Sequence, residues 1–372
     1  MFIQGAAPEE TVEVEIVQSK KRHHRARVIT VVEPGPARVT PTCEVFERCG
    51  GCVLQHVSLQ SQLQSKRAAV RSAIERIGRV QGAVEGPPWT GDGYGYRTRA
   101  RLFVAPSGAV GFRAAGSHEV VGIERCPIAA APINAGIAAL HTAELTNDEV
   151  QQVELVSVGK EALMRLPTAL ESDVDAASLP SGVRLVGSGD DETLEHDDGH
   201  GPMRYAPDVF AQANLAGNQA LVSYVDALLS RLETEDALEL YAGSGNFTRV
   251  LARRAPKVRA VESSRSATRL AKRILPGHVH LDGRTVEIAM RQVTTAPSLV
   301  LVDPPRAGLS KEVAGAIDAL APAAMIYVSC DPATFARDLT RLPAMRLEEY
   351  RVFDLYPQTA HVELAALLVR RA

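Results

Sequence analysis

Cysteine is scarce in this chain, which has five cysteines in 372 residues. A small, odd number of cysteines does not build the disulfide framework of a secreted protein. Long apolar runs are also missing, because none approaches the length of a membrane-spanning helix. The first residues, Met1–Glu10, contain neither the basic nor the apolar region of a signal peptide. These absences predict a cytoplasmic protein that does not enter a membrane.

Net charge is small as well, −3 for the whole chain, but it is unevenly distributed. Residues 141–200 contain 14 Asp and Glu against 3 Lys and Arg, so the remainder carries a net charge of +8. A basic remainder is compatible with binding a polyanion such as RNA. The acidic segment is at least as well explained as a solvated insertion. The length predicts two or three domains, and with no sign of an obligate protein partner we expect a monomer.

The N-terminal region, residues 1–40, contains two predicted strands within Thr11–Val32. Apolar residues alternate with glutamates in the first strand, and the second, Val28–Val32, is β-branched throughout. A basic run between them supplies predicted RNA contacts: Lys20, Lys21, Arg22 and Arg25. A hairpin with a basic tip suits a small β-barrel that contacts phosphates, although such a run is also typical of a solvated loop. Two strands are too few for an independent barrel, so we expect a partial one.

Four cysteines form a pattern that is typical of metal ligation: Cys43, Cys49, Cys52 and Cys126. Two thiolates separated by two residues can bind one metal centre, and Gly50 and Gly51 between them permit a tight turn. Four cysteines are suited to a tetrahedral zinc ion and to a [4Fe–4S] cluster. Four unrelated thiols are a weaker interpretation, because such spacing is an improbable accident in a cysteine-poor chain. The central region, residues 41–205, is therefore predicted to contain a metal centre.

The central region also contains a predicted helix and a predicted basic strand. The helix Val57–Gly78 has one apolar face, formed by Leu59, Leu63, Val70, Ile74 and Ile77. The segment Tyr94–Phe103 alternates and, as a strand, projects three arginines from one face: Arg97, Arg99 and Arg101. Three like charges side by side favour contact with an RNA backbone over an exposed strand with salt bridges.

From Ala237 the pattern changes to alternating strands and helices, which predicts a doubly wound α/β sheet in residues 206–372. The first strand leads into a loop with Gly243 and Gly245, and the second ends in Glu262. A carboxylate at that position can accept both ribose hydroxyls of a nucleoside cofactor. Because the loop has GxG rather than GxGxxG, and nothing nearby is suited to a pyrophosphate, the pattern favours S-adenosylmethionine over NAD.

Two later strands end in residues that can carry chemistry. Ser298–Val302 leads into Asp303, and Met325–Ser329 leads into Cys330. Open α/β sheets place their ligands at the carboxyl ends of strands, so Cys330 is a candidate functional residue. A buried core thiol is the competing interpretation of a lone cysteine. Two further strands near the end of the chain predict an antiparallel ending of the sheet.

These motifs together resemble the RNA uracil-5-methyltransferase family, and in particular its iron–sulfur branch, which acts on large-subunit ribosomal RNA. The resemblance spans nearly the whole chain and comprises, in order, Cys43…Cys49-Gly-Gly-Cys52…Cys126, Phe210-Ala-Gln212-Ala-Asn214, Gly243-Ser-Gly245-Asn246, Asp303-Pro-Pro-Arg306, Val-Ser-Cys330 and His361-Val-Glu363. It implies an N-terminal TRAM-like RNA-binding barrel, a central domain with a [4Fe–4S] cluster, and a Rossmann-like class I methyltransferase domain. It also implies a ribosomal RNA substrate, with transfer RNA as the alternative.

The resemblance implies roles for individual residues. Cys330 would add to C6 of the uracil, and Glu363 would remove the proton from C5 after methyl transfer. S-adenosylmethionine would be bound by Gln212, Tyr241, Gly243, Gly245, Asn246, Glu262, Asp282 and Asp303. Two other functions are compatible with parts of the sequence. An amino-methyltransferase also uses Asp-Pro-Pro, and an RNA-binding protein without activity would use the metal centre only as a structural element.

Overall fold

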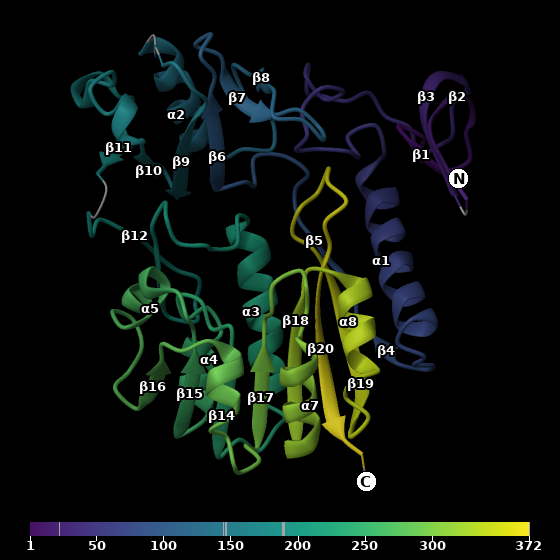
Figure 1. The fold of residues 1–372 in the computed structure, drawn as a ribbon, viewed down its shortest axis with the longest axis vertical. Helices are drawn as coiled ribbons and strands as arrows, with labels where there is room; N and C mark the ends of the chain where they lie inside the picture. The colour runs from purple at the N-terminus through teal and green to yellow at the C-terminus, as the bar shows by residue number, and fades with distance from the viewer. Residues whose placement is uncertain (22, 144, 146, 188–189, 372) are drawn as a thin grey trace.

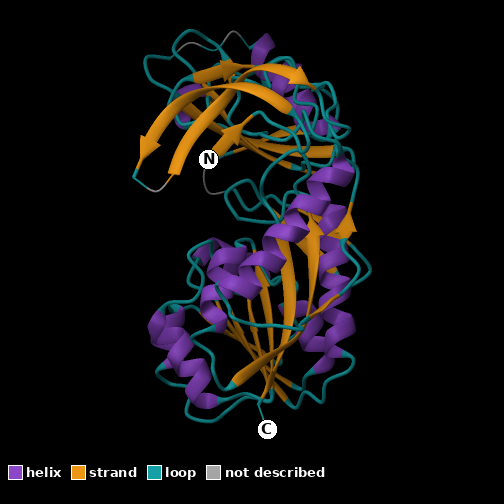
Figure 2. Ribbon diagram, turned by 90° about the vertical axis from the view of Figure 1, so that its right-hand side faces the viewer, coloured by secondary structure: helices purple, strands orange, loops and turns teal. Residues whose placement is uncertain are grey.

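The computed structural model describes residues 1–21, 23–143, 145, 147–187 and 190–371. Arg22, one of the predicted RNA contacts, lies outside these residues. In Figures 1 and 2 the N-terminal and central regions form the upper part of the molecule, and the C-terminal sheet forms the lower part. Helix α1 (Leu59–Arg76) extends from the upper part along one side of the lower part. Within the described part of the chain, no helix is both long and apolar enough to span a membrane.

The N-terminal region is a three-stranded sheet in the order β1 (Phe2–Gln4), β3 (His23–Glu33), β2 (Thr11–Lys20). Strands β2 and β3 pair antiparallel almost to the hairpin tip, so the basic run is largely strand rather than loop. The sheet leaves several apolar side chains exposed: Phe2, Ile16, Val17, Ile29 and Val32. An open sheet of this kind buries little apolar area. The TRAM-like barrel therefore stays a prediction.

The central region is built on a six-stranded sheet in the order β11-β10-β9-β6-β7-β8. Its strands are β6 (Arg99–Val104), β7 (Val110–Arg113), β8 (Val120–Gly122), β9 (Gln151–Val158), β10 (Glu161–Arg165) and β11 (Val183–Val186). Helix α2 (Ala131–Thr142) packs on this sheet and shares its apolar core. The hairpin of β12 (Leu194–Asp197) and β13 (Pro202–Tyr205) then leads to the C-terminal sheet.

The C-terminal sheet confirms the predicted doubly wound arrangement with an antiparallel ending. Its order is β16-β15-β14-β17-β18-β20-β19-β4, and β5 also pairs with β19. The strands are β4 (Val84–Glu85), β5 (Trp89–Thr90), β14 (Asp236–Leu240), β15 (Lys257–Val261), β16 (Val279–Asp282), β17 (Leu299–Val302), β18 (Ala324–Ser329), β19 (Met345–Asp354) and β20 (Glu363–Arg370). Strands β14 to β18 are parallel, and β20 runs antiparallel between β18 and β19.

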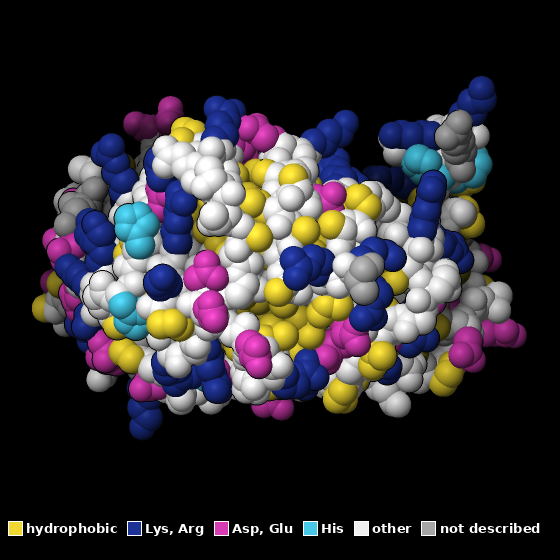
Figure 3. Space-filling model, turned by 90° about the horizontal axis from the view of Figure 1, so that it is seen from below, with side chains coloured by type: hydrophobic (Ala, Val, Ile, Leu, Met, Phe, Trp, Pro, Cys, Tyr) yellow, Lys and Arg dark blue, Asp and Glu magenta, His cyan; other side chains and the backbone are white. Residues whose placement is uncertain are grey.

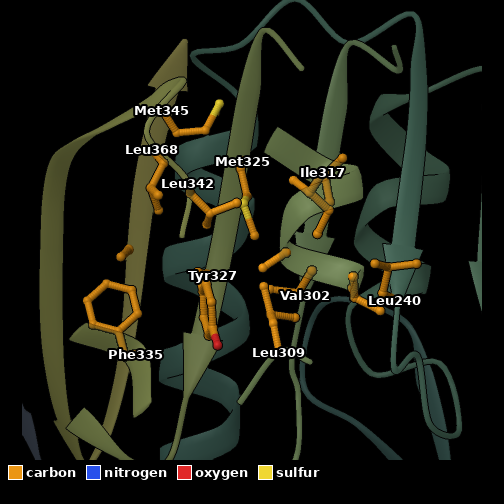
Figure 4. Packing of buried hydrophobic residues seen from close by; sticks show 14 of the residues in the cluster. Leu240, Val302, Leu309, Ile317, Met325, Tyr327, Phe335, Leu342, Met345 and Leu368 are labelled. Carbon is orange, nitrogen blue, oxygen red and sulfur yellow. The ribbon is translucent and has the colours of Figure 1, made fainter. Parts of the chain in front are cut away.

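Helices cover both faces of this sheet. They are α3 (Leu215–Leu229), α4 (Thr248–Arg254), α5 (Arg265–Ala271), α6 (Val286–Met290), α7 (Lys311–Leu320) and α8 (Pro332–Leu339). The core on one face joins the sheet to α6, α7, α8 and α1, and the core on the other face joins it to α3 and α4. Figure 4 shows the first core, where Tyr327 and Met325 of β18 lie between Phe335 and Ile317. Continuous apolar runs such as Leu299–Val302 are expected for parallel strands with both faces covered.

Helix α1 buries nearly the predicted face, but polar residues form part of it. The residues of α1 that are buried are Gln62, Lys66, Val70 and Ile74, whereas Ile77 is exposed. Val70 and Ile74 pack in the core of the C-terminal sheet, and α1 contacts both α8 and β19. The other half of the buried stripe is polar, because that half lies against a loop with backbone and carboxylate groups that need partners.

Candidate active site

The carboxyl ends of neighbouring strands bring together the residues that the sequence singled out. Strands β14, β17 and β18 are adjacent and parallel, so Tyr241, Asp303 and Cys330 follow them at one edge of the sheet. Strand β20 begins there with Glu363 and runs antiparallel to β18, with Ser329 opposite Leu364. One position further, Cys330 after β18 lies opposite Glu363 of β20. A thiol and a carboxyl from distant parts of the sequence therefore lie side by side.

The thiol of Cys330 is held in its neutral form. Burial, together with the nearby carboxylates of Glu363 and Asp303, raises its pKa to about 11, whereas the cationic Arg306 opposes the shift. Arg306 in turn lies 3.2 Å from His361, measured from Nη2 to Nδ1. A thiol in such surroundings needs positive charge before it becomes a nucleophile.

Two carboxyl groups beside Cys330 also have raised pKa values. Glu363 is only 4% exposed, and its Oε2 atom has no hydrogen-bond partner among the described residues. Burial raises the pKa of Glu363 well above its usual range, and the negative charge of Asp303 adds to the shift. Burial likewise raises the pKa of Asp303 to about 7. Carboxyl groups with raised pKa are suited to accept a proton from a substrate and hold it.

The glycine loop after β14 has the backbone of a tight turn. Tyr241, Gly243 and Gly245 all have positive φ angles of 64°, 57° and 95°. A Cβ atom placed on Gly243 would meet no other atom within 4 Å, so the loop is open on that side. Glu262 lies beside the loop, where its carboxylate accepts hydrogen bonds from the backbone N–H of Gly243 at 2.9 Å and of Ser264 at 2.6 Å.

Two other predicted cofactor residues are engaged by protein groups. Asp282 accepts hydrogen bonds from Arg259 and Arg284, and these guanidinium groups hold the pKa of its carboxyl far below the usual range. Its backbone carbonyl accepts a hydrogen bond from the N–H of Glu262, so the ends of β15 and β16 are tied together. Asn246 exchanges reciprocal amide hydrogen bonds with Asn218 of α3 at 2.8 and 2.9 Å.

Gln212 is connected to the edge of the sheet that carries Cys330 and Glu363 by a hydrogen bond to a residue that the sequence analysis did not single out. The hydroxyl of Tyr356, in the loop between β19 and β20, donates a hydrogen bond to Oε1 of Gln212 at 2.5 Å. Burial raises the pKa of Tyr356, and Glu363 adds to that shift. Asn214 caps α3 and also donates to the carbonyl of Leu355, which fixes the same loop. No motif marks Tyr356, because its role depends on contacts distant in sequence.

Glu239 is a second residue that sequence reasoning missed. It points into the interior from β14, and neither of its carboxylate oxygens has a hydrogen-bond partner among the described residues. Burial raises its pKa to about 8. The sequence feature that could have indicated Glu239 is an acidic residue within an apolar strand, because acidic side chains are almost never fully buried unless they are paired.

The four cysteines outside the active site line one cavity of about 80 Å³, together with Arg97 and apolar side chains such as Phe46 and Ile128. All are free thiols, and the backbone N–H of Gly51 points to the sulfur of Cys49 at 3.5 Å. In the described part of the chain, no three His, Cys, Asp or Glu side chains are grouped closely enough to hold a single metal ion. The four thiols thus line a cavity and do not converge on the position of a single metal ion.

The three arginines predicted on one strand have different surroundings. Strand β6 begins only at Arg99. Arg97 precedes the strand, and the Nε–H of Arg97 donates a hydrogen bond to the carbonyl of Arg99. Arg99 is turned inward, where its guanidinium donates to the carbonyls of Ala206, Pro207 and Val209. Arg101 is exposed and lies 3.6 Å from Glu154. Arg99 is therefore occupied by the protein's own backbone rather than available to RNA.

The basic hairpin of the N-terminal sheet is more accessible. Lys20 ends β2, and Arg25 lies in β3 with its side chain exposed. In Figure 3, Lys, Arg and His side chains gather on the projecting part at the right of the molecule, where Figure 1 has the β2–β3 hairpin. Elsewhere on that face the basic side chains are interspersed with acidic ones around an apolar area.

The sheet order, its antiparallel β20 and the glycine loop beside Glu262 define a class I methyltransferase domain. The profile of the tRNA (Uracil-5-)-methyltransferase family matches residues 182–278 and 283–371. The chain belongs to this family, which confirms the resemblance inferred from its motifs. It is therefore an enzyme, an S-adenosylmethionine-dependent methyltransferase of RNA uracil.

Individual relatives cover the whole chain. It is 33% identical to the 23S rRNA (uracil(1939)-C(5))-methyltransferase RlmD of Dichelobacter nodosus, over 100% of this chain and 93% of that protein. Identity to the enzyme of the same name from Salmonella typhimurium is 34%, over 100% and 91%. Among solved structures, the tRNA (uracil-54, C5)-methyltransferase of Pyrococcus abyssi in complex with S-adenosyl-L-homocysteine superposes with a TM-score of 0.75 at 25% identity. That superposition covers 99% of this chain and 94% of the other.

Proposed function

We propose that the protein methylates C5 of a uridine in 23S rRNA through a covalent adduct between Cys330 and C6 of the uracil ring. The single observation that carries this proposal is the adjacency of Cys330 and Glu363 at the β18–β20 edge. A nucleophile and a base that lie side by side are what the addition and elimination steps require. An amino-methyltransferase would have no use for this pair.

The first step is addition of the Cys330 thiolate to C6. A C6–S bond forms, and the electrons of the C5–C6 double bond move toward the O4 oxygen, which makes C5 nucleophilic. Because burial and two nearby carboxyl groups disfavour the thiolate, the positive charge of Arg306 is needed to stabilise it. The base must leave its stack to reach Cys330, which favours a substrate uridine in a loop.

The last step is removal of the C5 proton by the carboxylate of Glu363. The electrons of the C5–H bond restore the double bond, the C6–S bond breaks, and the Cys330 thiolate is released. Burial raises the pKa of Glu363, which makes its carboxylate a stronger base for this proton. Asp303 and Tyr356 lie near Glu363, because the charge of Asp303 raises the pKa of Glu363 and the charge of Glu363 raises the pKa of Tyr356.

The residues at the glycine loop are suited to S-adenosylmethionine. The fixed carboxylate of Glu262 can accept ribose hydroxyl groups, and the open side of Gly243 leaves room for the ligand. The other parts of S-adenosylmethionine would contact Tyr241, Gly245, Asp303 and Gln212. The loops around the cofactor would be held in place by Asp282 and Asn246. When bound, S-adenosylmethionine supplies a methyl group on a positively charged sulfur.

The cavity lined by Cys43, Cys49, Cys52 and Cys126 is suited to a [4Fe–4S] cluster. Cluster ligands surround a volume, and backbone N–H groups commonly point at their sulfurs, as Gly51 does here. The apolar lining would shield such a cluster from solvent. Zinc is the alternative, and analysis of iron and sulfide in anaerobically purified protein distinguishes the two.

Ribosomal RNA is favoured over tRNA because the relatives that cover the whole chain at 33–34% identity carry the 23S rRNA name. The test is to methylate 23S rRNA and tRNA transcripts with purified protein and to map 5-methyluridine by mass spectrometry. We expect 5-methyluridine in 23S rRNA at the position equivalent to uracil 1939 of the relatives. Methylation of tRNA alone would contradict the rRNA assignment.

A further inference from the structure

The polar half of the buried stripe of α1 has no part in the chemistry above. Gln62 is 1% exposed and Lys66 is 4% exposed, although both residue types normally lie at the surface. Both side chains are directed at the loop between β19 and β20, residues 355–362, which connects Asp354 to Glu363. Burying a polar side chain lowers the stability of the fold unless the side chain forms hydrogen bonds. The hydrogen-bond partners of Gln62 and Lys66 therefore show which segments these residues hold in place.

Gln62 joins two segments that are distant in sequence. Its Nε2 atom lies within hydrogen-bonding distance of the carbonyls of Leu54 and Val57, at 3.0 and 2.7 Å, and of Oε1 of Gln358, at 3.0 Å. Its Oε1 atom accepts a hydrogen bond from the backbone N–H of Gln358 at 2.8 Å. The segment that follows Cys52 is thereby fastened to the β19–β20 loop through one amide group.

Gln358 is held from the other side as well. Its backbone carbonyl accepts hydrogen bonds from the N–H groups of Val53 and Leu54, both at 2.9 Å. Its φ angle of 70° is unusual for a residue other than glycine and persists only where surrounding contacts enforce it. Gln358 lies five residues before Glu363, so its position sets where the chain enters β20.

Two further contacts fasten the same loop. Lys66 forms a buried ion pair with Asp354 at 2.7 Å and also donates to the carbonyl of Tyr356. The hydroxyl of Tyr96 donates to the carbonyl of Pro357 at 2.9 Å. Helix α1 and the cysteine-bearing region therefore hold Asp354 at the end of β19 and the loop residues Tyr356, Pro357 and Gln358.

We propose that Gln62 is a positioning residue for the proton-removal step, because it fixes the loop that aims Glu363 at the C5 proton. This inference rests on the proposed function, in which Glu363 removes that proton. Gln62 does not touch Cys330, so loosening the loop should disturb elimination more than addition. Displacement of a catalytic group by about 1 Å can cost on the order of a hundredfold in rate.

The test uses Gln62→Met, which keeps the length of the side chain and removes its hydrogen bonds. Gln64→Met, on the exposed face of the same helix, is the matched control. Two rates are measured with the full-length protein and S-adenosylmethionine. One is formation of the denaturation-resistant adduct with RNA containing 5-fluorouridine, which needs Cys330 but not proton removal. The other is turnover of natural RNA, together with the amount of adduct that accumulates during it.

We expect Gln62→Met to lower turnover by about tenfold to a hundredfold and to accumulate adduct on natural RNA, while its 5-fluorouridine trapping rate stays within about twofold of wild type. Gln64→Met should match wild type in both assays. Equal losses of trapping and turnover, or no loss of either, would overturn the positioning role. If Gln62→Met fails to unfold cooperatively, Gln62→Asn, which keeps the amide group but shortens the side chain by one methylene, decides by the same two rates. Absence of an adduct with wild-type protein would refute the proposed function instead.

Discussion

Cys330 and Glu363 face each other one position beyond the paired residues Ser329 and Leu364 of the antiparallel strands β18 and β20. Cys330 follows Ser329, and Glu363 precedes Leu364. The sequence separates them by a helix, a strand and a loop, yet the sheet places the thiol beside the carboxyl. The negative charge of Glu363 raises the pKa of Cys330. This coupling connects the two ends of the proposed reaction, thiolate addition and proton removal.

The reactivity of Cys330 should depend steeply on pH. Only the thiolate reacts with iodoacetamide, so with a pKa of about 11 the alkylation rate should rise about tenfold per pH unit between about pH 7 and pH 10. Glu363→Gln removes a negative charge and should move the whole profile to lower pH. Mass spectrometry of the Cys330 peptide measures the rate, with Cys330→Ala as the blank. A plateau below about pH 9 in the wild type would contradict this account.

Removing Lys66 should destabilise the protein strongly. Lys66→Met leaves the carboxylate of Asp354 buried without its cation, which typically costs about 3–5 kcal/mol. The double variant Lys66→Met/Asp354→Asn should lose less, because no unpaired charge remains. Urea unfolding of both variants measures the free energy of unfolding. A loss of under about 1 kcal/mol for Lys66→Met would show that the pair behaves like an exposed one.

Arg99 and Arg101 should respond differently to substitution despite their spacing. Arg99→Met removes the bonds to three backbone carbonyls and should lower the melting temperature while leaving the salt dependence of RNA binding unchanged. Arg101→Met should leave the melting temperature unchanged and reduce the slope of log affinity against log salt by about one. Binding titrations at several salt concentrations decide. The reverse pattern would mean that the guanidinium of Arg99 reaches RNA.

Metal content tests the cysteine-lined cavity. Anaerobically purified protein should be brown and contain iron and acid-labile sulfide in equal amounts, and Cys52→Ser should lose most of both. Cys330→Ala is the matched control, because its thiol lies at the other site and its iron content should be unchanged. A colourless protein with one equivalent of zinc would contradict the cluster assignment.

Most of the C-terminal sheet could be predicted because its parallel strands are buried on both faces. Runs such as Leu299–Val302 are apolar throughout and end in a chemically distinctive residue, here Asp303. The same regularity located Cys330 at a strand end. Glu363 was implied by resemblance alone, because the antiparallel pairing that brings it to Cys330 joins β18 to the last strand of the chain.

Other features could not be predicted because they depend on partners that are distant in sequence. The alternation around Arg99 predicts an outward side chain, but the segment 206–209 covers it. Helical spacing places Lys66 on the apolar face of α1, but the sequence does not show that Asp354, 288 residues later, is the partner of this buried charge. Strands β9 to β13 lie in a region whose sequence has no clear pattern, and the place of β9 in the sheet depends on its pairing with the distant strand β6.

The central claim is that Cys330 attacks the uracil ring. The most direct measurement is to incubate the protein with S-adenosylmethionine and RNA containing 5-fluorouridine, digest the denatured complex, and identify the cross-linked peptide by mass spectrometry. Because fluorine cannot leave as a proton, elimination is blocked, and the account predicts a methylated nucleotide attached to the sulfur of Cys330 in the wild type and no adduct with Cys330→Ala. An adduct on a different residue, or full methylation of natural RNA by Cys330→Ala, would contradict it.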